Sequence, residues 1–294
     1  MSYEKVSPAH PDKLCDRLAG AIVDLAYARE RDPRIAVEVL AGHGKVFVII
    51  ETSLSREQLS CAEIDPIVWR IFGNDVEINV TIVSQDPILS DMQKEGMRVA
   101  DNGIFKGCPP TEEQRVLTAI AATIYGTIPY DGKYIIQQRD GQWDLTVCQS
   151  HLSREQEPEL RQMLKEGYNV HLPTINPLGP WTGGIDVDCG CTNRKLGSDM
   201  GDSVTGGGLM GKDLSKADVS VNIVCHLKAV ASRQVVTAIC SIGDECVTFT
   251  YADGRTETER FADIVEQARL YILTDCQGSF ERFAMWGLIA PPAL

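Results

Sequence analysis

Residues 34–52 of the chain read RIAVEVLAGHGKVFVIIET, and this stretch decides the fold. Two runs rich in β-branched residues flank the glycine-containing turn at 42–45, a pattern typical of a β-hairpin. Before the hairpin, apolar residues recur at helical spacing between 12 and 29. After it, Ser55 and Gln58 form a capping-box pair, which predicts the start of a second helix. The predicted order is therefore helix, hairpin, helix.

The same order of elements returns in the middle of the chain. Thr111 and Gln114 predict the start of a helix, and a strand pair around Asp140-Gly141 follows it. Ser153 and Gln156 then predict a second helix start after that hairpin. The middle of the chain therefore looks like a second copy of the unit.

A third copy follows in the last third of the chain. A helical stretch near 214–230 leads to strands at 234–241 and 246–251, after which Thr256 and Glu259 predict a capped helix. The near-regular spacing of the three caps predicts an α+β fold with three pseudo-symmetric subdomains, each a β-sheet with helices on one face. We place these subdomains at residues 1–88, 89–181 and 182–294.

Composition limits the class of protein. With 294 residues, of which 44% are hydrophobic, the chain exceeds the size of a single core. A net charge of −13 argues against nucleic acid as a partner, because non-specific binding needs a basic surface. The polar start and the lack of a bilayer-length apolar run predict a soluble, cytoplasmic protein without a membrane partner. The ten scattered cysteines indicate reduced thiols.

The motif His10-Pro11-Asp12-Lys13 stands at the start of the first predicted helix. Helix amino termini attract anions, and a carboxylate there can hold a metal ion. The alternative is that Asp12 only caps the helix beside solvated neighbours. The motif alone leaves both interpretations open.

Two glutamates lie within the strands of the first hairpin. Glu38 shares a strand face with Ala36 and Leu40, and Glu51 ends the run that precedes the next cap. A buried carboxylate needs a cation, an amine or a metal as its partner. The alternative is that both glutamates face water from an exposed strand.

The segment from Asp188 to Asp218 combines glycines, cations and carboxylates. Glycines let backbone N–H groups approach phosphate, lysines neutralise it, and aspartates can hold Mg²⁺. Gly206 to Lys212 has the spacing of a P-loop, but Asp213 replaces the required hydroxyl and no apolar strand precedes the loop, so we reject that interpretation. A plain solvated loop is the alternative.

Taken together, the motif at His10, the strand glutamates and the glycine-rich segment resemble the S-adenosylmethionine synthetase family. The order and intervals of the motifs match, and the resemblance covers nearly the whole chain. It implies a homodimer with shared active sites, with a tetramer as an alternative. It also implies that S-adenosylmethionine is made from ATP and L-methionine, and that the tripolyphosphate is hydrolysed to pyrophosphate and phosphate.

The resemblance further implies a role for individual residues. The expected catalytic residues are His10, Lys133, Arg194, Lys195 and Lys212. The expected ATP contacts are Asp101, Asp131, Lys133, Trp181, Asp188, Arg194, Lys195 and Lys212. The expected methionine contacts are Glu51, Gln85, Asp188, Lys216 and Ile242. The expected metal ligands are Asp12 and Asp218 for two Mg²⁺ ions per site and Glu38 for K⁺.

In the family pattern, His10, Lys133 and Lys195 would face Asp188 and Lys212 across the dimer. The segment between Gln85 and Asp101, which corresponds to a mobile loop of the family, is expected to be shortened. Two other functions remain as alternatives. A kinase or ligase would need a strand-loop-helix that the sequence lacks. A catalytically silent ATP-binding subunit related to the synthetase would be expected to lose some of the cations.

Overall fold

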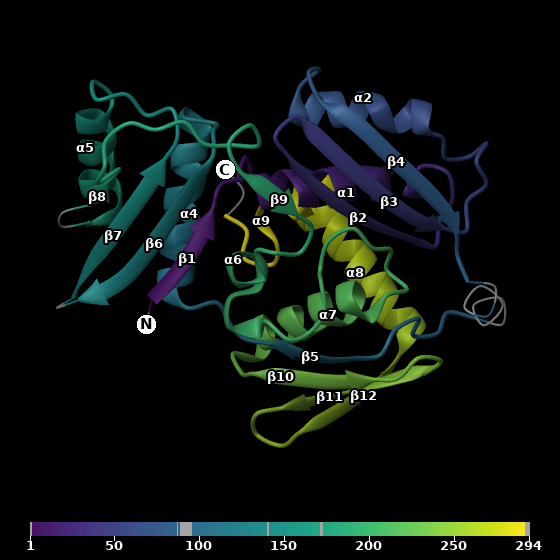
Figure 1. Ribbon diagram of the computed structural model, residues 1–294. Coiled ribbons are helices and arrows are strands. Elements are labelled where there is room, and N and C mark those ends of the chain that lie inside the picture. Colours follow the sequence, from purple (N-terminus) through teal and green to yellow (C-terminus); the bar gives the residue numbers. More distant parts are fainter. Residues whose placement is uncertain (1, 87, 89–95, 140, 171–172, 292–294) are drawn as a thin grey trace.

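The computed structural model describes residues 2–86, 88, 96–139, 141–170 and 173–291. Just over half of the segment between Gln85 and Asp101, which we expected to be shortened, lies outside the described residues. The described residues form three four-stranded sheets around a central group of helices (Figure 1). The expected α+β fold of three sheet subdomains with helices is confirmed.

The first sheet is built on the hairpin of residues 34–52. His43 and Gly44 both have positive φ angles, 51° and 76°, as a two-residue hairpin turn requires. Helices α1 (Pro11–Tyr27) and α2 (Cys61–Phe72) belong to this subdomain, and α1 packs directly on β2. The strand order is β4 (Glu77–Ser84), β3 (Lys45–Thr52), β2 (Ile35–Gly42) and β9 (Cys189–Cys191).

The second sheet contains the second predicted hairpin, and helix α4 (Glu112–Thr127) packs on it, with α5 (Glu157–Tyr168) beside α4. The capping box of Thr111 and Gln114 starts α4 as predicted. The strand order is β1 (Ser2–Val6), β6 (Gly132–Arg139), β7 (Gln142–Gln149) and β8 (Thr174–Ile175).

The third sheet is covered by helices α7 (Ala217–Ser232) and α8 (Phe261–Asp275). Three short helices, α6 (Leu196–Met200), the 3₁₀ helix η2 (Gly201–Ser203) and α9 (Phe280–Trp286), complete the described elements. The strand order is β12 (Thr256–Arg260), β11 (Cys246–Tyr251), β10 (Val236–Cys240) and β5 (Gly103–Gly107).

The sheets do not follow contiguous stretches of the chain. Strand β1 joins the second sheet, β5 joins the third, and β9 returns to the edge of the first. The proposed boundaries at 1–88, 89–181 and 182–294 stay a prediction, but each sheet contains a strand from outside the stretch that holds its hairpin. This exchange brings residues near 190 next to the start of α1.

Three predicted helix starts differ from the structure: one lies in a strand, and two come before the residue at which the helix begins. Thr256 and Glu259 do not cap a helix, because residues 256–260 form β12 and α8 begins at Phe261, so this prediction is wrong. The predicted side-chain exchange does occur between Ser55 and Gln58 and between Ser153 and Gln156. It closes a turn in each case, and α2 and α5 begin only after that turn, at Cys61 and Glu157.

The helices bury one face of each sheet and leave the other face open. One hydrophobic core joins the first and third sheets, and a second core lies under the second sheet. The open faces carry large apolar side chains that are between 41% and 71% exposed. They are Leu40, Phe47, Ile49 and Val83 on the first sheet, Ile135 on the second, and Ile104 and Ile239 on the third.

All ten cysteines are free thiols. Within the described part of the chain, we find no helix with the length and apolar character required to cross a bilayer.

Candidate active site

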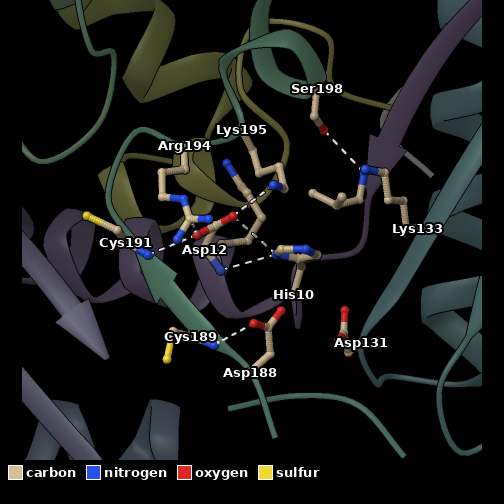
Figure 2. A network of polar contacts seen from close by, with 12 residues as sticks. His10, Asp12, Asp131, Lys133, Asp188, Cys189, Cys191, Arg194, Lys195 and Ser198 are labelled. Atoms are coloured by element: carbon tan, nitrogen blue, oxygen red, sulfur yellow. Dashed lines mark hydrogen bonds and ion pairs between the residues drawn. The ribbon is translucent and has the colours of Figure 1, made fainter. Parts of the chain in front are cut away.

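A cluster of polar side chains forms where α1 begins, and we call it the His10 cluster. It comprises His10, Asp12, Asp131, Asp188, Arg194 and Lys195 (Figure 2). His10 is the N-cap of α1, and its Nδ1 accepts a hydrogen bond of 3.1 Å from the Asp12 N–H. In the neutral ring, the proton is therefore on Nε2, which is free to donate.

Asp12 is the centre of this cluster and is only 1% exposed. Its carboxylate accepts a hydrogen bond from the Cys191 N–H at 2.9 Å, which ties β9 to α1. It also contacts the Lys195 ammonium at 2.9 Å and the Arg194 Nε at 3.5 Å. A buried carboxylate needs such cations. The N-cap is His10, so the alternative interpretation, in which Asp12 only caps the helix beside solvated neighbours, is wrong.

The surroundings of His10 keep its ring neutral. Burial lowers the pKa of His10 to about 4, and the positive charge of Lys195 adds to this effect. The charges of Asp12 and Asp188 act in the opposite direction but do not overcome it. At neutral pH, the His10 ring is therefore an uncharged hydrogen-bond donor next to two cations.

Asp131 and Asp188 complete the cluster and lie on the side of His10 away from Arg194 (Figure 2). Burial raises the pKa of Asp131 to about 6, and the Gly184 N–H donates to its carboxylate at 3.0 Å. Asp188 is exposed and lies beside His10 and Asp131 in the same chain (Figure 2). The family pattern implied that Asp188 lies with Lys212, facing His10 across the dimer. Within this chain, Asp188 instead lies beside His10.

Trp181 and Lys133 border the His10 cluster. A Cβ atom on Gly183 would lie 2.3 Å from the Trp181 ring and 2.7 Å from an Asp131 oxygen, so the indole and the carboxylate are neighbours. Lys133 forms an ion pair of 2.9 Å with Glu4, and its charge still contributes to lowering the pKa of His10. Both residues are partly exposed.

A second cluster forms at the glycine-rich segment, and we call it the Lys212 cluster. It comprises Lys212, Lys216 and Asp218. The Lys212 ammonium contacts the Asp218 carboxylate at 2.6 Å, and Asp218 lies in the first turn of α7. A Cβ atom on Gly207 would lie 2.0 Å from an Asp218 oxygen, so the loop backbone passes directly over the carboxylate. Residues 201–212 do not form the strand and helix of a P-loop.

Two predicted contacts adjoin Lys216, which is the N-cap of α7. The Ala100 N–H donates to the Ser215 carbonyl at 3.2 Å, which brings the segments that contain Asp101 and Lys216 together. The Ile242 N–H donates to the Asn102 side chain at 2.7 Å. Asp101 and Ile242 therefore lie on the side of the Lys212 cluster.

The strand glutamates and Gln85 lie at different places on the first sheet. Glu51 pairs with Ala36, and Ala36 bridges to Lys212 on its other side. Gln85 follows β4, and its buried side-chain oxygen has no hydrogen-bond partner among the described residues. Glu38 lies on the open face and accepts a hydrogen bond from the Thr192 hydroxyl. Glu38 is therefore exposed, which agrees with the alternative interpretation that it faces water from the strand.

The two clusters occupy separate positions along the same edge of β2. Cys191, which binds Asp12, pairs with Leu40, whereas Lys212 pairs with Ala36. Four residues of a strand span about 13 Å. Within one chain, the expected phosphate-binding cations are therefore divided into two groups, and Asp12 and Asp218 do not meet. Among the residues that the structure describes, no group of three potential ligands could hold a metal ion.

A buried ionic network behind the clusters was not predicted. The Lys13 ammonium contacts the Asp199 carboxylate at 2.7 Å and that of Asp16 at 3.0 Å, and all three residues are fully buried. Asp16 accepts a hydrogen bond from the Asn193 N–H at 2.8 Å. Helical i, i+3 spacing could have indicated the pair of Lys13 and Asp16, but no sequence signal links either residue to Asp199.

The chain is similar in sequence to known proteins over most of its length. The family model described as S-adenosylmethionine synthetase, N-terminal domain, matches residues 1–80. S-adenosylmethionine synthase 1 of Rhodopseudomonas palustris (strain BisB18) is 28% identical, over 88% of this chain and 79% of the relative. S-adenosylmethionine synthase 2 of Rhodospirillum rubrum is 27% identical, over 90% and 83%.

The S-adenosylmethionine synthase of Mycoplasma mycoides subsp. mycoides SC is 26% identical, over 77% of this chain and 71% of the relative. In all, 227 curated proteins match the chain. The matches span most of the chain, and the motifs at His10 and Lys212 lie in a fold of three sheets. The chain is therefore similar to S-adenosylmethionine synthases over most of its length, and its first 80 residues match the N-terminal domain of that family.

Proposed function

We propose that the protein makes S-adenosylmethionine from ATP and L-methionine and then hydrolyses the tripolyphosphate to pyrophosphate and phosphate. The observation that supports this proposal most is the pairing of two buried aspartates with cations, Asp12 with Arg194 and Lys195 and Asp218 with Lys212. This arrangement suits an anion with several charges, such as a polyphosphate.

The proposed chemistry needs no covalent enzyme intermediate. The methionine sulfur attacks the 5′ carbon of ATP, so that a sulfur–carbon bond forms and the carbon–oxygen bond to the triphosphate breaks. The triphosphate leaves with the bonding electrons, and the sulfur becomes a sulfonium. A neutral sulfur is already nucleophilic, so the protein has to align the reacting atoms and stabilise the charge that grows on the leaving group.

The His10 cluster would supply the first part of this stabilisation. Arg194 and Lys195 would bind phosphate oxygens, and Lys133 would add a third positive charge. The neutral ring of His10 would donate a hydrogen bond from Nε2 to an oxygen of the triphosphate. Asp131, Asp188 and Trp181 would hold the nucleoside, with the exposed indole of Trp181 against the base.

The Lys212 cluster would complete the site. Lys212 would bind the polyphosphate, and Asp101 would contribute to ATP binding. Together with Asp188 of the His10 cluster, Glu51, Gln85, Lys216 and Ile242 would bind methionine. The buried Gln85 oxygen, which has no partner among the described residues, is suited to accept a hydrogen bond from the methionine ammonium.

Mg²⁺ fits the donor set at the two aspartates. In proteins, Mg²⁺ is bound by one or two carboxylates together with substrate phosphates and water. Asp12 and Asp218 each offer one carboxylate, and these residues are 1% and 6% exposed. Two bound Mg²⁺ ions would neutralise charge on the tripolyphosphate. Glu38 offers one carboxylate on the open sheet face, where K⁺ would find an oxygen ligand.

We further propose a homodimer in which each active site takes one cluster from each subunit. Within one chain, the β2 residues that contact the two clusters are four positions apart, about 13 Å. The open face of the first sheet exposes the neighbouring apolar side chains of Leu40, Phe47 and Ile49, which mark an interaction surface. A two-fold axis would place the same face of each subunit against the other and would create two identical sites.

The interface can be tested with Ile49→Lys, which places a charge in the open face of the first sheet. We expect this variant to sediment as a monomer and to lose activity. Leu270→Lys is the matched control, because Leu270 is equally exposed, at 60% against 57%, but lies on α8. A dimeric, active Ile49→Lys variant would contradict the proposed interface.

The reaction is tested by incubating the protein with ATP, L-methionine and Mg²⁺, with and without K⁺. We expect S-adenosylmethionine together with equal amounts of pyrophosphate and phosphate. Lys195→Ala should abolish product formation, whereas Lys165→Ala, which removes an exposed lysine of α5, should not. Binding of ATP without any product would instead support the silent ATP-binding subunit.

A further inference from the structure

Asn193 lies between the two clusters and contacts both of the segments that carry them. It precedes Arg194 in the chain, and its φ of +61° is in the left-handed region, which asparagine and glycine adopt more readily than other residues. Its backbone N–H donates to the buried Asp16 carboxylate at 2.8 Å. The backbone of Asn193 is therefore fixed to α1.

The side-chain amide of Asn193 holds the glycine-rich loop. Its Oδ1 accepts a hydrogen bond of 2.8 Å from the Met210 N–H, and its Nδ2 donates one of 3.1 Å to the Met210 carbonyl. A Cβ atom on Gly208 would lie 2.6 Å from Asn193 Cγ, so the amide packs directly on the loop backbone. Among the described residues, Asn193 supplies both hydrogen bonds that the structure shows for residues 206–210.

This two-bond contact is two residues away from Lys212. Gly211 follows Met210, and its carbonyl accepts a hydrogen bond of 2.7 Å from the Val37 N–H. Lys212 then bridges to Ala36 and reaches Asp218. The position of the Lys212 ammonium therefore depends on the path that the backbone takes from Met210 onwards.

The segment that carries Lys195 does not depend on the same amide. The Thr192 N–H donates to the Val39 carbonyl at 3.0 Å, and the Asp199 N–H donates to the Lys195 carbonyl at 3.0 Å. The Lys195 ammonium is held by Asp12. Loss of the Asn193 side chain would leave all of these contacts in place, as well as the bond from its backbone to Asp16.

We propose that Asn193 is a positioning residue for Lys212, and that it acts on a different active site from the one to which its neighbour Lys195 belongs. The inference rests on the proposed shared site, in which Lys195 and Lys212 of one chain serve two different sites. Asn193 would thus position Lys212 in one active site. The neighbouring cations Arg194 and Lys195 of the same chain would belong to the other active site.

The first test uses Asn193→Gly, which preserves the left-handed backbone and the N–H bond to Asp16 but removes the amide. Hydrogen exchange should become faster for residues 206–212 and stay unchanged for 189–192. We expect kcat to fall about tenfold, which corresponds to about 1.4 kcal/mol, with little change in the KM for ATP. Asn169→Gly is the matched control, since Asn169 is also left-handed, at φ +53°, but is exposed at the end of α5.

The second test uses mixed dimers purified through two different tags. In a dimer of Asn193→Gly with Lys212→Ala, the only intact set of cations includes Lys212 of the Asn193→Gly subunit. Activity should be about tenfold below that of wild type paired with Lys212→Ala. In a dimer of Asn193→Gly with Lys195→Ala, the active site uses Lys212 of the other subunit, and activity should equal that of wild type paired with Lys195→Ala.

Unchanged hydrogen exchange in Asn193→Gly would overturn the inference whether or not the protein is active. Equal losses in both mixed dimers would overturn it as well. The mixed dimer of Lys195→Ala with Lys212→Ala separates the two reasons for equal losses, because it is active only if the sites are shared. If it is active, Asn193 acts on both sites, and if it is inactive, the shared site itself is wrong.

Discussion

Replacement of Lys13 by methionine should strongly destabilise the protein. The Lys13 ammonium is fully buried and balances two carboxylates, at 2.7 Å and 3.0 Å. Methionine has a similar length but no charge, so Asp16 and Asp199 would be left buried without their cation. Breaking a buried ion pair in this way costs about 3–5 kcal/mol. This is a large share of the stability of an ordinary domain.

Lys228→Met is the matched control, because Lys228 also contacts two carboxylates, those of Glu257 and Glu259. Those carboxylates are partly exposed, so water can replace the lost ammonium. We expect a cost of about 1 kcal/mol or less, as for other ion pairs near the surface. The two variants thus remove the same kind of contact in two different environments.

The loss in Lys13→Met should also depend on pH. Burial raises the pKa of Asp16 to about 6 in the folded protein, against 3.8 as its ordinary value, and Lys13 opposes this rise. The stability linked to this raised pKa is fully present below about 3.8 and is lost as the pH rises through about 6. Without Lys13 the pKa rises further, so the variant should lose less stability at about pH 5.5 than at about pH 8.

The assay is urea unfolding of wild type and both variants at one protomer concentration, because the stability of a dimer depends on concentration. The slopes against urea should agree, so that the shift in midpoint reports stability. The reasoning is refuted if Lys13→Met costs no more than Lys228→Met at about pH 8. It is also refuted if the loss does not diminish at the lower pH.

Two other predictions concern the start of α1. The His10 ring should titrate near pH 4 in an NMR experiment, and Lys195→Met should raise that midpoint because a nearby positive charge is removed; a midpoint near 6.5 in the wild type would contradict the neutral ring. Gly190→Ala should cost about 1–3 kcal/mol and most of the activity, since the added Cβ would lie 2.1 Å from the Pro11 carbonyl oxygen. Gly254→Ala, in an open turn at φ +86°, should cost about 1 kcal/mol and leave activity intact, and similar activities for the two variants would count against the tight packing.

The sequence predicted those parts of the fold that local patterns determine. The hairpin at 42–45 and the cap at Thr111 depend on residues within a few positions of each other, and both form as expected. Strands β1, β5 and β9 have their partners far away in the chain, so no local pattern could assign them to a sheet. Thr256 and Glu259 have the spacing of a cap, but pairing with β11 places them in a strand.

The candidate site could be predicted in its residue types but not in its grouping. The residue types around His10, Asp12 and the lysines predict a polyphosphate site, because charged side chains next to glycines suit such an anion. Their division into two clusters depends on the position of β9 and Lys212 along β2, which is a tertiary property. The contact of Asn193 with Met210 is also a tertiary property and could not be predicted from the sequence, because 17 positions separate the two residues.

The most direct test of the central claim is the activity of a mixed dimer of Lys195→Ala with Lys212→Ala. Each variant alone should be nearly inactive, because each lacks a cation aimed at the leaving triphosphate. In the mixed dimer, both lesions fall into one site and the other site is intact. The mixed dimer, purified through two different tags, should therefore form S-adenosylmethionine at about half the wild-type rate. A purified mixed dimer that is no more active than the separate variants would show that both lysines serve one subunit's own site.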